Sequence, residues 1–474
     1  WGHRIPAYYC PQCGEMVVAK AADAPHACPK CGHHGMEQDP DTLDTWFSSA
    51  LWPFSTLGWP EQTEDLDYFY PTDVLVTGYD IIFFWVIRMV FSGYEQMGKA
   101  PFHTVLMHGL VRDSKGRKMS KSLGNGIDPL EVIDQYGADA LRLTLITGNA
   151  PGNDMRFYWE RVEASRNFAN KVWNASRFIL MNLEGRELTE PSAQTLEPAD
   201  RWMISKLNTL AKDMTENMDK FELGIAVQKV YDFIWDEFCD WYIEIAKQRI
   251  YQYDAAPEAG NAALWTLRMV LTEALKLLHP FMPFLTEEIF CTLHPQEASI
   301  MLAKWPEYDD ARHFETEEEM LSHVKDIVKA VRTVRKDMDV PNSRKAKLFL
   351  VSADETIRGM LEQAKESCQN LANASEICIQ ADRAGIGEDA VSVVIPGATV
   401  YLPFEELVDR AKEFERLTKD RARLQKELAR SHGMLGNEKF LNKAPQSKIE
   451  EEKKKLAEYE KMMAEVEQRL AQMK

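Results

Sequence analysis

The sequence predicts a multidomain protein of the α/β plus α class. Three observations lead to this prediction. The first third of the chain mixes short, β-branched apolar runs with helical segments, the middle shows sustained helical spacing, and the last part combines a mixed segment with a 3–4 apolar alternation. At 474 residues the chain is long enough for about three domains, each with a core of its own.

A basic loop between a predicted strand and a predicted helix is the most informative stretch. Thr104–Gly109 reads as a buried strand, and Pro129–Ile146 reads as one helix with proline at its start. Between them lies Lys118–Ser122, with the sequence KMSKS, flanked by glycines. Nucleotides bind at strand ends in open α/β sheets, where lysine can neutralise charge on a transferring phosphate. The loop lacks P-loop spacing, and a solvated basic loop is the alternative interpretation.

A second strand, Asp73–Gly78, precedes the apolar segment Tyr79–Glu95. We expect that segment to be a buried helix, because it is hydrophobic on all sides. Gly78 lets a ligand come close, and the Asp80 carboxylate can accept hydrogen bonds from ribose hydroxyls. The alternative role for Asp80 is a helix cap.

The segment from residue 39 to residue 59 predicts a short amphipathic helix. Asp44 or Thr42 is expected to be its N-cap. Its aromatic residues are typical of a core, and we assign Phe47 and Trp52 to the core on that basis.

Two C-x-x-C pairs near the start predict a structural zinc site, because four thiolates suit one tetrahedral Zn²⁺. The four residues are Cys10, Cys13, Cys28 and Cys31. A closed four-thiolate site leaves no position for catalysis, and a redox pair would need only one such motif. His26, His33 and His34 are near enough to be rival ligands but are expected at the surface.

Helical periodicity continues from residue 157 to residue 293 and predicts an α-helical bundle, broken at Pro280 and Pro283. Residues 346–403 then predict a small α/β module with three short strands. A helix is expected between the first two strands. Cys368 and Cys378 are expected to be buried in this module as small hydrophobic side chains.

The last segment, residues 404–474, predicts an antiparallel helical hairpin of coiled-coil type within one chain. Oligomerisation or simple packing is the alternative interpretation. This segment carries 17 Lys and Arg against 15 Asp and Glu, whereas the rest carries 39 against 59. Its basic residues available for phosphate contacts include Arg416, Lys419, Arg423, Lys426, Lys439 and Lys443.

Composition limits the classes of function. The net charge of −18 argues against nucleic-acid binding by bulk electrostatics, so any RNA contact must come from local basic patches and shape. No apolar run approaches the ~18 residues of a membrane helix, and no signal peptide is recognised. Eight cysteines, partly clustered, indicate a reducing cytoplasmic setting.

The KMSKS run matches the second signature of the class I aminoacyl-tRNA synthetases. The wider run from Phe102 to Arg142 resembles the valyl-tRNA synthetases, and the resemblance covers nearly the whole chain. It implies the second half of a Rossmann-like catalytic domain with a zinc knuckle at residues 1–147. It further implies an anticodon-binding bundle at 148–345, a small α/β linker module at 346–403 and a coiled-coil tRNA-binding arm at 404–474.

The resemblance also implies ligands and roles. The ligands would be ATP with Mg²⁺, valine and tRNA(Val), bound by a monomer. The catalytic residues would be Lys118, Lys121, Ser120 and Ser122. The ATP-binding residues would be Gly78, Asp80, His108, Gly109, Leu110, Met119 and Lys121. The walls of the amino-acid pocket would be Trp46 and Ile81.

The sequence contains no His-x-Gly-His segment, the first signature of the family, which supplies the other half of the ATP site. We therefore expect the C-terminal portion of a longer protein, inactive by itself, whose editing site lies elsewhere. A valine pocket rejects threonine only about 10²-fold, so an editing site is needed. Two alternatives stay open: a non-catalytic tRNA-binding fragment of a split or decayed synthetase, and an isoleucyl-tRNA synthetase.

Overall fold

A computed structural model describes residues 2–341, 343–407, 410–437 and 446–472. The chain divides into two compact units. The first comprises Trp1–Glu184, Thr209–Asp236 and Leu271–Tyr308, and the second comprises Gly185–Asn208, Glu237–Val270 and Asp309–Lys474. Within the described ranges, no helix combines the length and apolar character that crossing a membrane requires.

The first unit begins with a small antiparallel sheet in the order β2-β1-β3. Its strands are β1 (Ala7–Tyr9), β2 (Met16–Val18) and β3 (Glu37–Gln38), and η1 (Ala21–Asp23) follows β2. Short helices α1 (Thr45–Ser49), α2 (Trp52–Ser55) and α3 (Glu64–Phe69) come next. Asp44 caps α1 by accepting from Trp46 N at 2.9 Å, which confirms one of the two expected caps.

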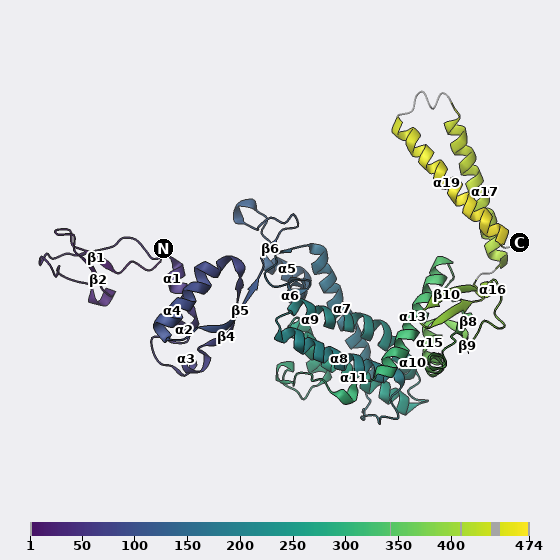
Figure 1. The fold of residues 1–474 in the computed structure, drawn as a ribbon, viewed down its shortest axis with the longest axis horizontal. Helices are drawn as coiled ribbons and strands as arrows, with labels where there is room; N and C mark the ends of the chain where they lie inside the picture. Colours follow the sequence, from purple (N-terminus) through teal and green to yellow (C-terminus); the bar gives the residue numbers. More distant parts are fainter. Residues whose placement is uncertain (1, 342, 408–409, 438–445, 473–474) are drawn as a thin grey trace. The chain divides into compact units, whose positions relative to one another are not determined.

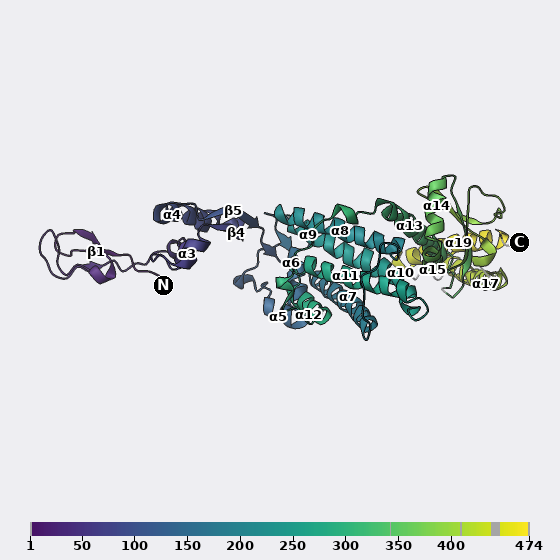
Figure 2. The same cartoon turned by 90° about the horizontal axis from the view of Figure 1, so that it is seen from below.

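Two parallel strands, β4 (Thr72–Gly78) and β5 (Phe102–His108), form the centre of this part. The crossover runs through η2 (Tyr79–Ile81), the π-helix η3 (Ile82–Val86) and α4 (Ile87–Met97). In both views α4 runs alongside the two strands (Figure 1 and Figure 2). Val86, Met89 and Phe102 form the buried contact, with Leu75 packed against them.

The prediction of a fully buried helix over Tyr79–Glu95 is wrong. Phe83 is 81% exposed, and Phe84, Ile87 and Phe91 are about half exposed. The prediction that Phe47 and Trp52 lie in the core is also wrong, because both side chains are exposed. One face of the helix packs on the strands, and α1 and α2 also contact it, but Phe83, Ile87 and Phe91 stay exposed.

The basic loop follows β6 (Val111–Arg112), which pairs in parallel with β7 (Met155–Arg156). The loop contains η4 (Lys121–Leu123) and leads into α5 (Pro129–Tyr136) and α6 (Ala138–Ile146). A single helix was expected over Pro129–Ile146. Gly137, with φ of +88°, breaks it, because such backbone angles favour glycine and end a helix.

Long helices dominate the middle of the chain, as predicted. They are α7 (Trp159–Leu183), α8 (Pro198–Asp219), α9 (Leu223–Asp232), the π-helix η5 (Phe233–Tyr242), α10 (Ile243–Tyr251), α11 (Pro257–Leu278) and α12 (Pro283–Leu293). Short turns η6 (Ile300–Leu302) and η7 (Asp310–Arg312) precede α13 (Glu315–Asp337). Helix α13 was not predicted from the sequence. Its buried stripe includes Val324, Ile327 and Val331, which is ordinary helical spacing.

A joint within the first unit connects α6 to α12, and Figure 2 shows α12 beside α7. Asp139 accepts hydrogen bonds from Phe284 N at 3.3 Å and Leu285 N at 2.7 Å, at the start of α12. Arg142 donates to the carbonyl oxygens of residues 280 and 281 just before that helix. Burial raises the pKa of the Asp139 carboxyl, while the two N–H groups oppose that shift.

The second unit contains a buried ion pair between α8 and α10. Arg249 donates two hydrogen bonds to Asp200, at 2.7 and 2.6 Å, and Tyr242 Oη donates a third at 2.6 Å. Asp200 is completely buried. The hydrogen bond and charge of Asp200 raise the pKa of Arg249 despite burial, so this guanidinium stays charged.

A four-stranded sheet in the order β10-β11-β8-β9 follows. Its strands are β8 (Ala346–Val351), β9 (Ala374–Gln380), β10 (Val391–Ile395) and β11 (Ala398–Leu402), with α14 (Glu355–Gln363) and α15 (Lys365–Leu371) between β8 and β9. Three of these strands were predicted, and β11 was not. Cys368 is buried as expected, whereas Cys378 is only half-buried.

After α16 (Phe404–Leu407), two long helices pack against each other, α17 (Arg410–Leu435) and α19 (Gln446–Gln472). Figure 1 shows them side by side. Leu417 and Leu424 are buried between them, seven residues apart. Ser431 donates to Glu452 across the pair at 2.7 Å. In the described residues, two helices of the segment predicted as a helical hairpin therefore pack against each other.

Candidate nucleotide site

The ends of β4 and β5 bring together five of the predicted ATP-binding residues, Gly78, Asp80, His108, Gly109 and Leu110. Gly78 pairs with His108 in the parallel register. A Cβ on Gly78 would lie 2.8 Å from an Asp80 oxygen and 3.7 Å from the His108 ring, so the three residues lie together. Gly109 is more constrained, since a Cβ there would lie 1.8 Å from the carbonyl oxygen of Asn153. The glycine therefore permits two main-chain segments to meet behind the site.

Asp154, which was not predicted from the sequence, holds these strand ends together. It accepts hydrogen bonds from Leu110 N at 2.7 Å and Tyr79 Oη at 3.0 Å, and it pairs with Arg112 Nε. The Leu110 N–H and then the Arg112 guanidinium lower the pKa of this carboxyl. Since Tyr79 follows β4 and Leu110 follows β5, one carboxylate fixes both turns.

Lys118 of the basic loop reaches back to the strand ends. Its Nζ atom lies 3.5 Å from Asp80 Oδ2. Two residues that the sequence predicted on separate grounds therefore face each other. Lys121 and Ser122 lie on the exposed turn η4, where Lys121 has no ion pair among the described residues. Ser120 and Ser122 place their Oγ atoms 3.1 Å apart.

Met119 anchors the loop to a buried apolar cluster. Its side chain packs against the core cluster formed by Val132, Ala140, Phe157 and Val162. The sequence predicted Met119 as an ATP-binding residue, and the structure places its side chain against this core cluster.

Trp46 lies at the other side of this region. Its ring stacks on Phe84, with centroids 5.9 Å apart, and Trp85 Nε1 donates to Ser49 O at 3.0 Å. Helix α1 thus packs against η3, the segment that follows Ile81. Trp46 and Ile81 both remain half-buried.

The four predicted cysteines come together in one cluster. All four sulfur atoms lie within 4.8 Å of one another, with Cys10–Cys31 and Cys13–Cys28 each at 3.6 Å. Ligands of a tetrahedral zinc–thiolate centre lie about 3.8 Å apart, so the spacing fits Zn²⁺. Desolvation opposes ionisation of Cys28, but backbone N–H groups of residues 30 and 31 lower its pKa to about 7. The three histidines stay outside the cluster.

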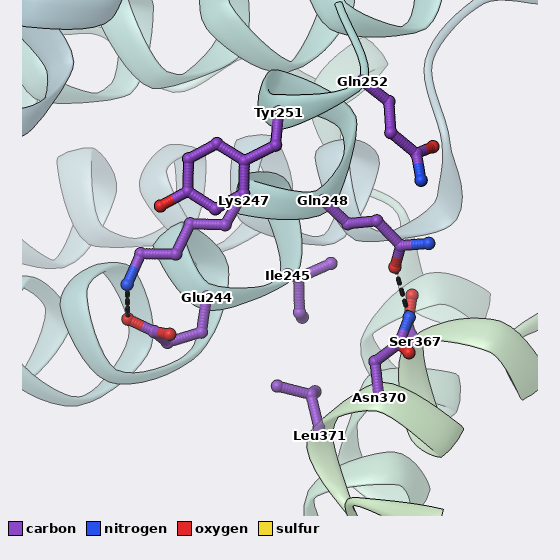
Figure 3. Close-up of a pocket in the computed structure, with 9 residues that line it drawn as sticks. All are labelled: Glu244, Ile245, Lys247, Gln248, Tyr251, Gln252, Ser367, Asn370 and Leu371. Atoms are coloured by element: carbon purple, nitrogen blue, oxygen red, sulfur yellow. Dashed lines mark hydrogen bonds and ion pairs between the residues drawn. The ribbon is translucent and has the colours of Figure 1, made fainter. Parts of the chain in front are cut away.

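The described residues also form hollows away from the cysteine cluster. An apolar cavity of about 310 Å³ adjoins the end of β5 and includes Leu106, His108 and Gly109 in its lining. A polar pocket of about 370 Å³ lies between α10 and α15 (Figure 3). Four of its lining side chains are paired with one another: Lys247 with Glu244 at 2.5 Å, and Asn370 Nδ2 donates to Gln248 Oε1. We assign the second pocket no ligand.

The predicted basic residues of the hairpin are partly described. Lys419, Arg423 and Lys426 are exposed on α17, and Arg423 lies 3.2 Å from Asp420. Lys439 and Lys443 lie outside the described residues, as does the side chain of Arg416.

Comparison with known proteins identifies the class. Residues 1–158 match the family "tRNA synthetases class I (I, L, M and V)", and residues 200–350 match "Anticodon-binding domain of tRNA ligase". Residues 409–474 match "Valyl tRNA synthetase tRNA binding arm". The agnB2 LeuRS of Agrobacterium radiobacter K84, solved with tRNA and LeuAMS, shares the fold with a TM-score of 0.53 at 21% identity, over 66% of this chain and 42% of that one. The chain belongs to the class I tRNA synthetases.

Within this class the chain is similar to valine–tRNA ligases. It is 52% identical to that of Clostridium perfringens and 54% identical to that of Clostridium tetani, in each case over 96% of its own length. Both alignments cover 51% of the relative. The chain therefore spans about half the length of the curated relatives it matches.

Proposed function

We propose that this chain carries one half of a valine-activating site and the tRNA-binding parts of a valine–tRNA ligase. A valine carboxylate oxygen attacks the α-phosphorus of ATP, and the bond from that phosphorus to pyrophosphate breaks. Valyl-adenylate and pyrophosphate result. A hydroxyl of the terminal ribose of tRNA(Val) then takes the valyl group and AMP leaves. No side chain forms a covalent bond, so rate depends on placement and charge stabilisation.

The ion pair between Lys118 and Asp80 is the observation that carries this proposal. Asp80 would accept from the ribose hydroxyls, Gly78 would let the sugar approach, and His108–Leu110 would face the adenine through the main chain. When ATP binds, Lys118 would move from Asp80 to the phosphates and act with Lys121 on the leaving pyrophosphate. Trp46 and Ile81 would line the valine pocket, with Mg²⁺ accompanying ATP.

A bare sheet face supports the idea that the site needs a second half. Val74 and Val76 are 39% and 57% exposed on β4. Parallel strands are ordinarily covered on both faces. We propose that an α/β segment, on the same or a companion chain, covers this face and completes the ATP site. The editing activity would belong to that part as well.

The helical parts would bind tRNA(Val). Helix α7 has no acidic residue from position 164 to position 183, although the chain is acidic overall. That stretch carries Arg166, Lys171 and Arg177 together with the exposed Trp173, a combination suited to phosphates and unpaired bases. The hairpin, as an intramolecular coiled coil, would contact the tRNA elsewhere. The domain boundaries at residues 147, 345 and 403 are part of this proposal.

Cys10, Cys13, Cys28 and Cys31 would hold one structural Zn²⁺. The ion would brace the knuckle without taking part in the reaction, since four thiolates close its coordination. Metal analysis of the purified chain tests this. One equivalent of zinc that is lost in Cys13→Ser but kept in Cys378→Ser would support it, and an absence of zinc in the parent would contradict it.

Valine-dependent exchange of pyrophosphate into ATP tests the proposed function. The chain is assayed alone and together with the other half of the Clostridium perfringens valine–tRNA ligase. We expect exchange only with both parts, and a drop in kcat of about 10²–10³ in Lys121→Ala. Lys115→Ala, exposed on the same segment, is the matched control. tRNA binding without exchange in either preparation would favour a non-catalytic fragment.

A further inference from the structure

The basic loop is held in shape by two side chains that none of the predicted roles includes, Asp113 and Asn125. Asp113 is 8% exposed, although it lies in a loop. Its Oδ1 atom accepts from Lys115 N at 3.1 Å and Arg117 N at 2.8 Å. Its Oδ2 atom accepts from Arg117 Nε at 2.8 Å and Asn125 Nδ2 at 3.0 Å. The carboxylate thus ties the turn after β6 to the far end of the loop.

Asn125 extends this tie to the main chain on both sides of Met119. Its Oδ1 atom accepts from Ser120 N at 2.9 Å, and its Nδ2 group lies 3.3 Å from the carbonyl oxygen of Lys118. One amide therefore fixes the peptide groups before and after the anchored methionine. The Asn125 amide is the largest of the contacts that hold the pKa of Asp113 far below its usual range. The acceptor of the whole network stays ionised as a result.

Lys118 begins at this clamped main chain and reaches Asp80 at 3.5 Å. A long lysine side chain has many rotamers, so its direction depends on how firmly its own peptide is held. Lys121, three residues further, lies on the exposed turn between Ser120 and Asn125. Of the two lysines, Lys118 is the one whose own carbonyl oxygen is held by Asn125, so the clamp acts on it directly.

We propose that Asp113 and Asn125 are positioning residues for adenylate formation: they fix the main chain at Lys118 and Ser120 so that the Lys118 ammonium faces the nucleotide. This inference rests on the proposed function. Because the clamp orders a group that stabilises charge developing during phosphoryl attack, its loss lowers kcat and leaves KM for ATP nearly unchanged.

The test compares Asn125→Ala with the parent in the preparation that supports pyrophosphate exchange. We expect kcat to fall about 10- to 100-fold, the change that loss of one hydrogen bond to a charged group produces. Asn217→Ala is the matched control. Asn217 also donates to a main-chain carbonyl, that of Asp213 at 2.6 Å, but on α8. The Asn217→Ala variant should have the same kcat as the parent.

Two further measurements separate positioning from simple destabilisation. Amide hydrogen exchange at Ser120 should accelerate in Asn125→Ala while exchange in α5 and α7 stays at the parent rate. Asn125→Asp should lose activity because it places two carboxylates together. The exchanged pair D113N/N125D should recover part of that loss, since it restores one N–H···O contact between the side chains.

An unchanged kcat in Asn125→Ala, in an active preparation, would overturn this inference and leave the proposed function standing. A fall in kcat accompanied by faster exchange throughout α5 and α7 would also overturn it, because the effect would then be loss of fold. A parent without valine-dependent exchange in any preparation would overturn the proposed function and this inference together.

Discussion

Gly109 shows how strictly single residues are constrained at the strand ends. Its absent side chain leaves room for the main chain of residues 153 and 154, and a Cβ would lie within 1.8 to 2.5 Å of their atoms. Those atoms belong to the backbone that carries Asp154, so they cannot rotate away as a side chain would. The contact that fixes the turns after β4 and β5 therefore depends on the glycine.

We predict that Gly109→Ala lowers the free energy of unfolding by about 3 kcal/mol, because two main-chain segments must separate. Gly126→Ala is the matched control. A Cβ at Gly126 meets nothing within 4 Å, so its effect should stay below about 1 kcal/mol. Denaturant unfolding of both variants measures the difference. Equal effects would show that the close approach behind Gly109 does not limit stability.

At this scale the sequence predicted side chains but not their partners. Asp80 and Lys118 were each chosen from a local pattern, and their proximity followed only from the fold. Asp154 was missed because its partner Leu110 lies 44 residues away in the sequence. Asp113 and Asn125 stand beside the KMSKS run, yet an isolated Asp and Asn in a polar loop carry no pattern that distinguishes a clamp from a turn.

At the scale of elements, α8 and α10 are joined by a buried charge pair rather than by apolar packing alone. Asp200 accepts four hydrogen bonds, from Arg249 twice, from Tyr242 and from Glu197 N. Every donor would lose its partner if the carboxylate were removed. Burying a guanidinium without its counter-ion lowers the free energy of unfolding.

We expect Asp200→Ala to lower the free energy of unfolding by about 3–5 kcal/mol. Glu244→Gln serves as the control, because Glu244 and Lys247 form a surface pair on α10 worth less than about 1 kcal/mol. Thermal and urea unfolding would measure both. A loss of similar size in the two variants would mean that burial of the Asp200 pair adds nothing to its strength.

Periodicity located most helices well, since it depends only on which side of a helix is covered. It predicted burial wrongly where an apolar segment is not fully packed against another segment. The segment Ile82–Phe91 carries apolar residues on every side, yet several point to solvent in the described chain. The exposure of Phe47 and Trp52 has the same cause. A local run of apolar residues indicates that a surface needs to be covered. It does not show whether the covering segment lies on the same chain.

At the scale of the whole molecule, charge is distributed unevenly. The chain has a net charge of −18, yet residues 404–474 carry slightly more basic than acidic side chains. Long-range attraction of RNA to this protein is therefore weak, and binding must depend on contacts made at short range. Lys419 and Arg423 are one helical turn apart on α17 and exposed.

We predict that K419A/R423A weakens tRNA binding and makes its salt dependence shallower. The slope of log K against log salt should decrease in magnitude by about 1–2, since two phosphate contacts are lost. K365A/R383A, in the α/β module at 346–403, is the matched control for charge. Filter binding at several salt concentrations measures both. An unaltered slope in K419A/R423A would remove α17 from the RNA contact.

The order of parts along the chain was predictable because each part has its own pattern, whereas their internal joints were not. The link between α6 and α12 is such a case. Asp139 and Arg142 contact only main-chain N–H and C=O groups around Pro280–Leu285. Among the described residues, each of these hydrogen bonds goes to a main-chain group on the receiving side, so that side leaves no recognisable hydrogen-bonding pair in the sequence.

That joint has a consequence for how the molecule can change over time. A joint made of hydrogen bonds to main-chain groups tolerates most substitutions on the helix that supplies those groups. The exposed side chain of Phe284 can vary without loosening it, as long as no proline removes the N–H of Phe284 or Leu285. The joint therefore depends on two side chains of α6, Asp139 and Arg142. The sequence of the helical bundle can change while these hydrogen bonds are kept.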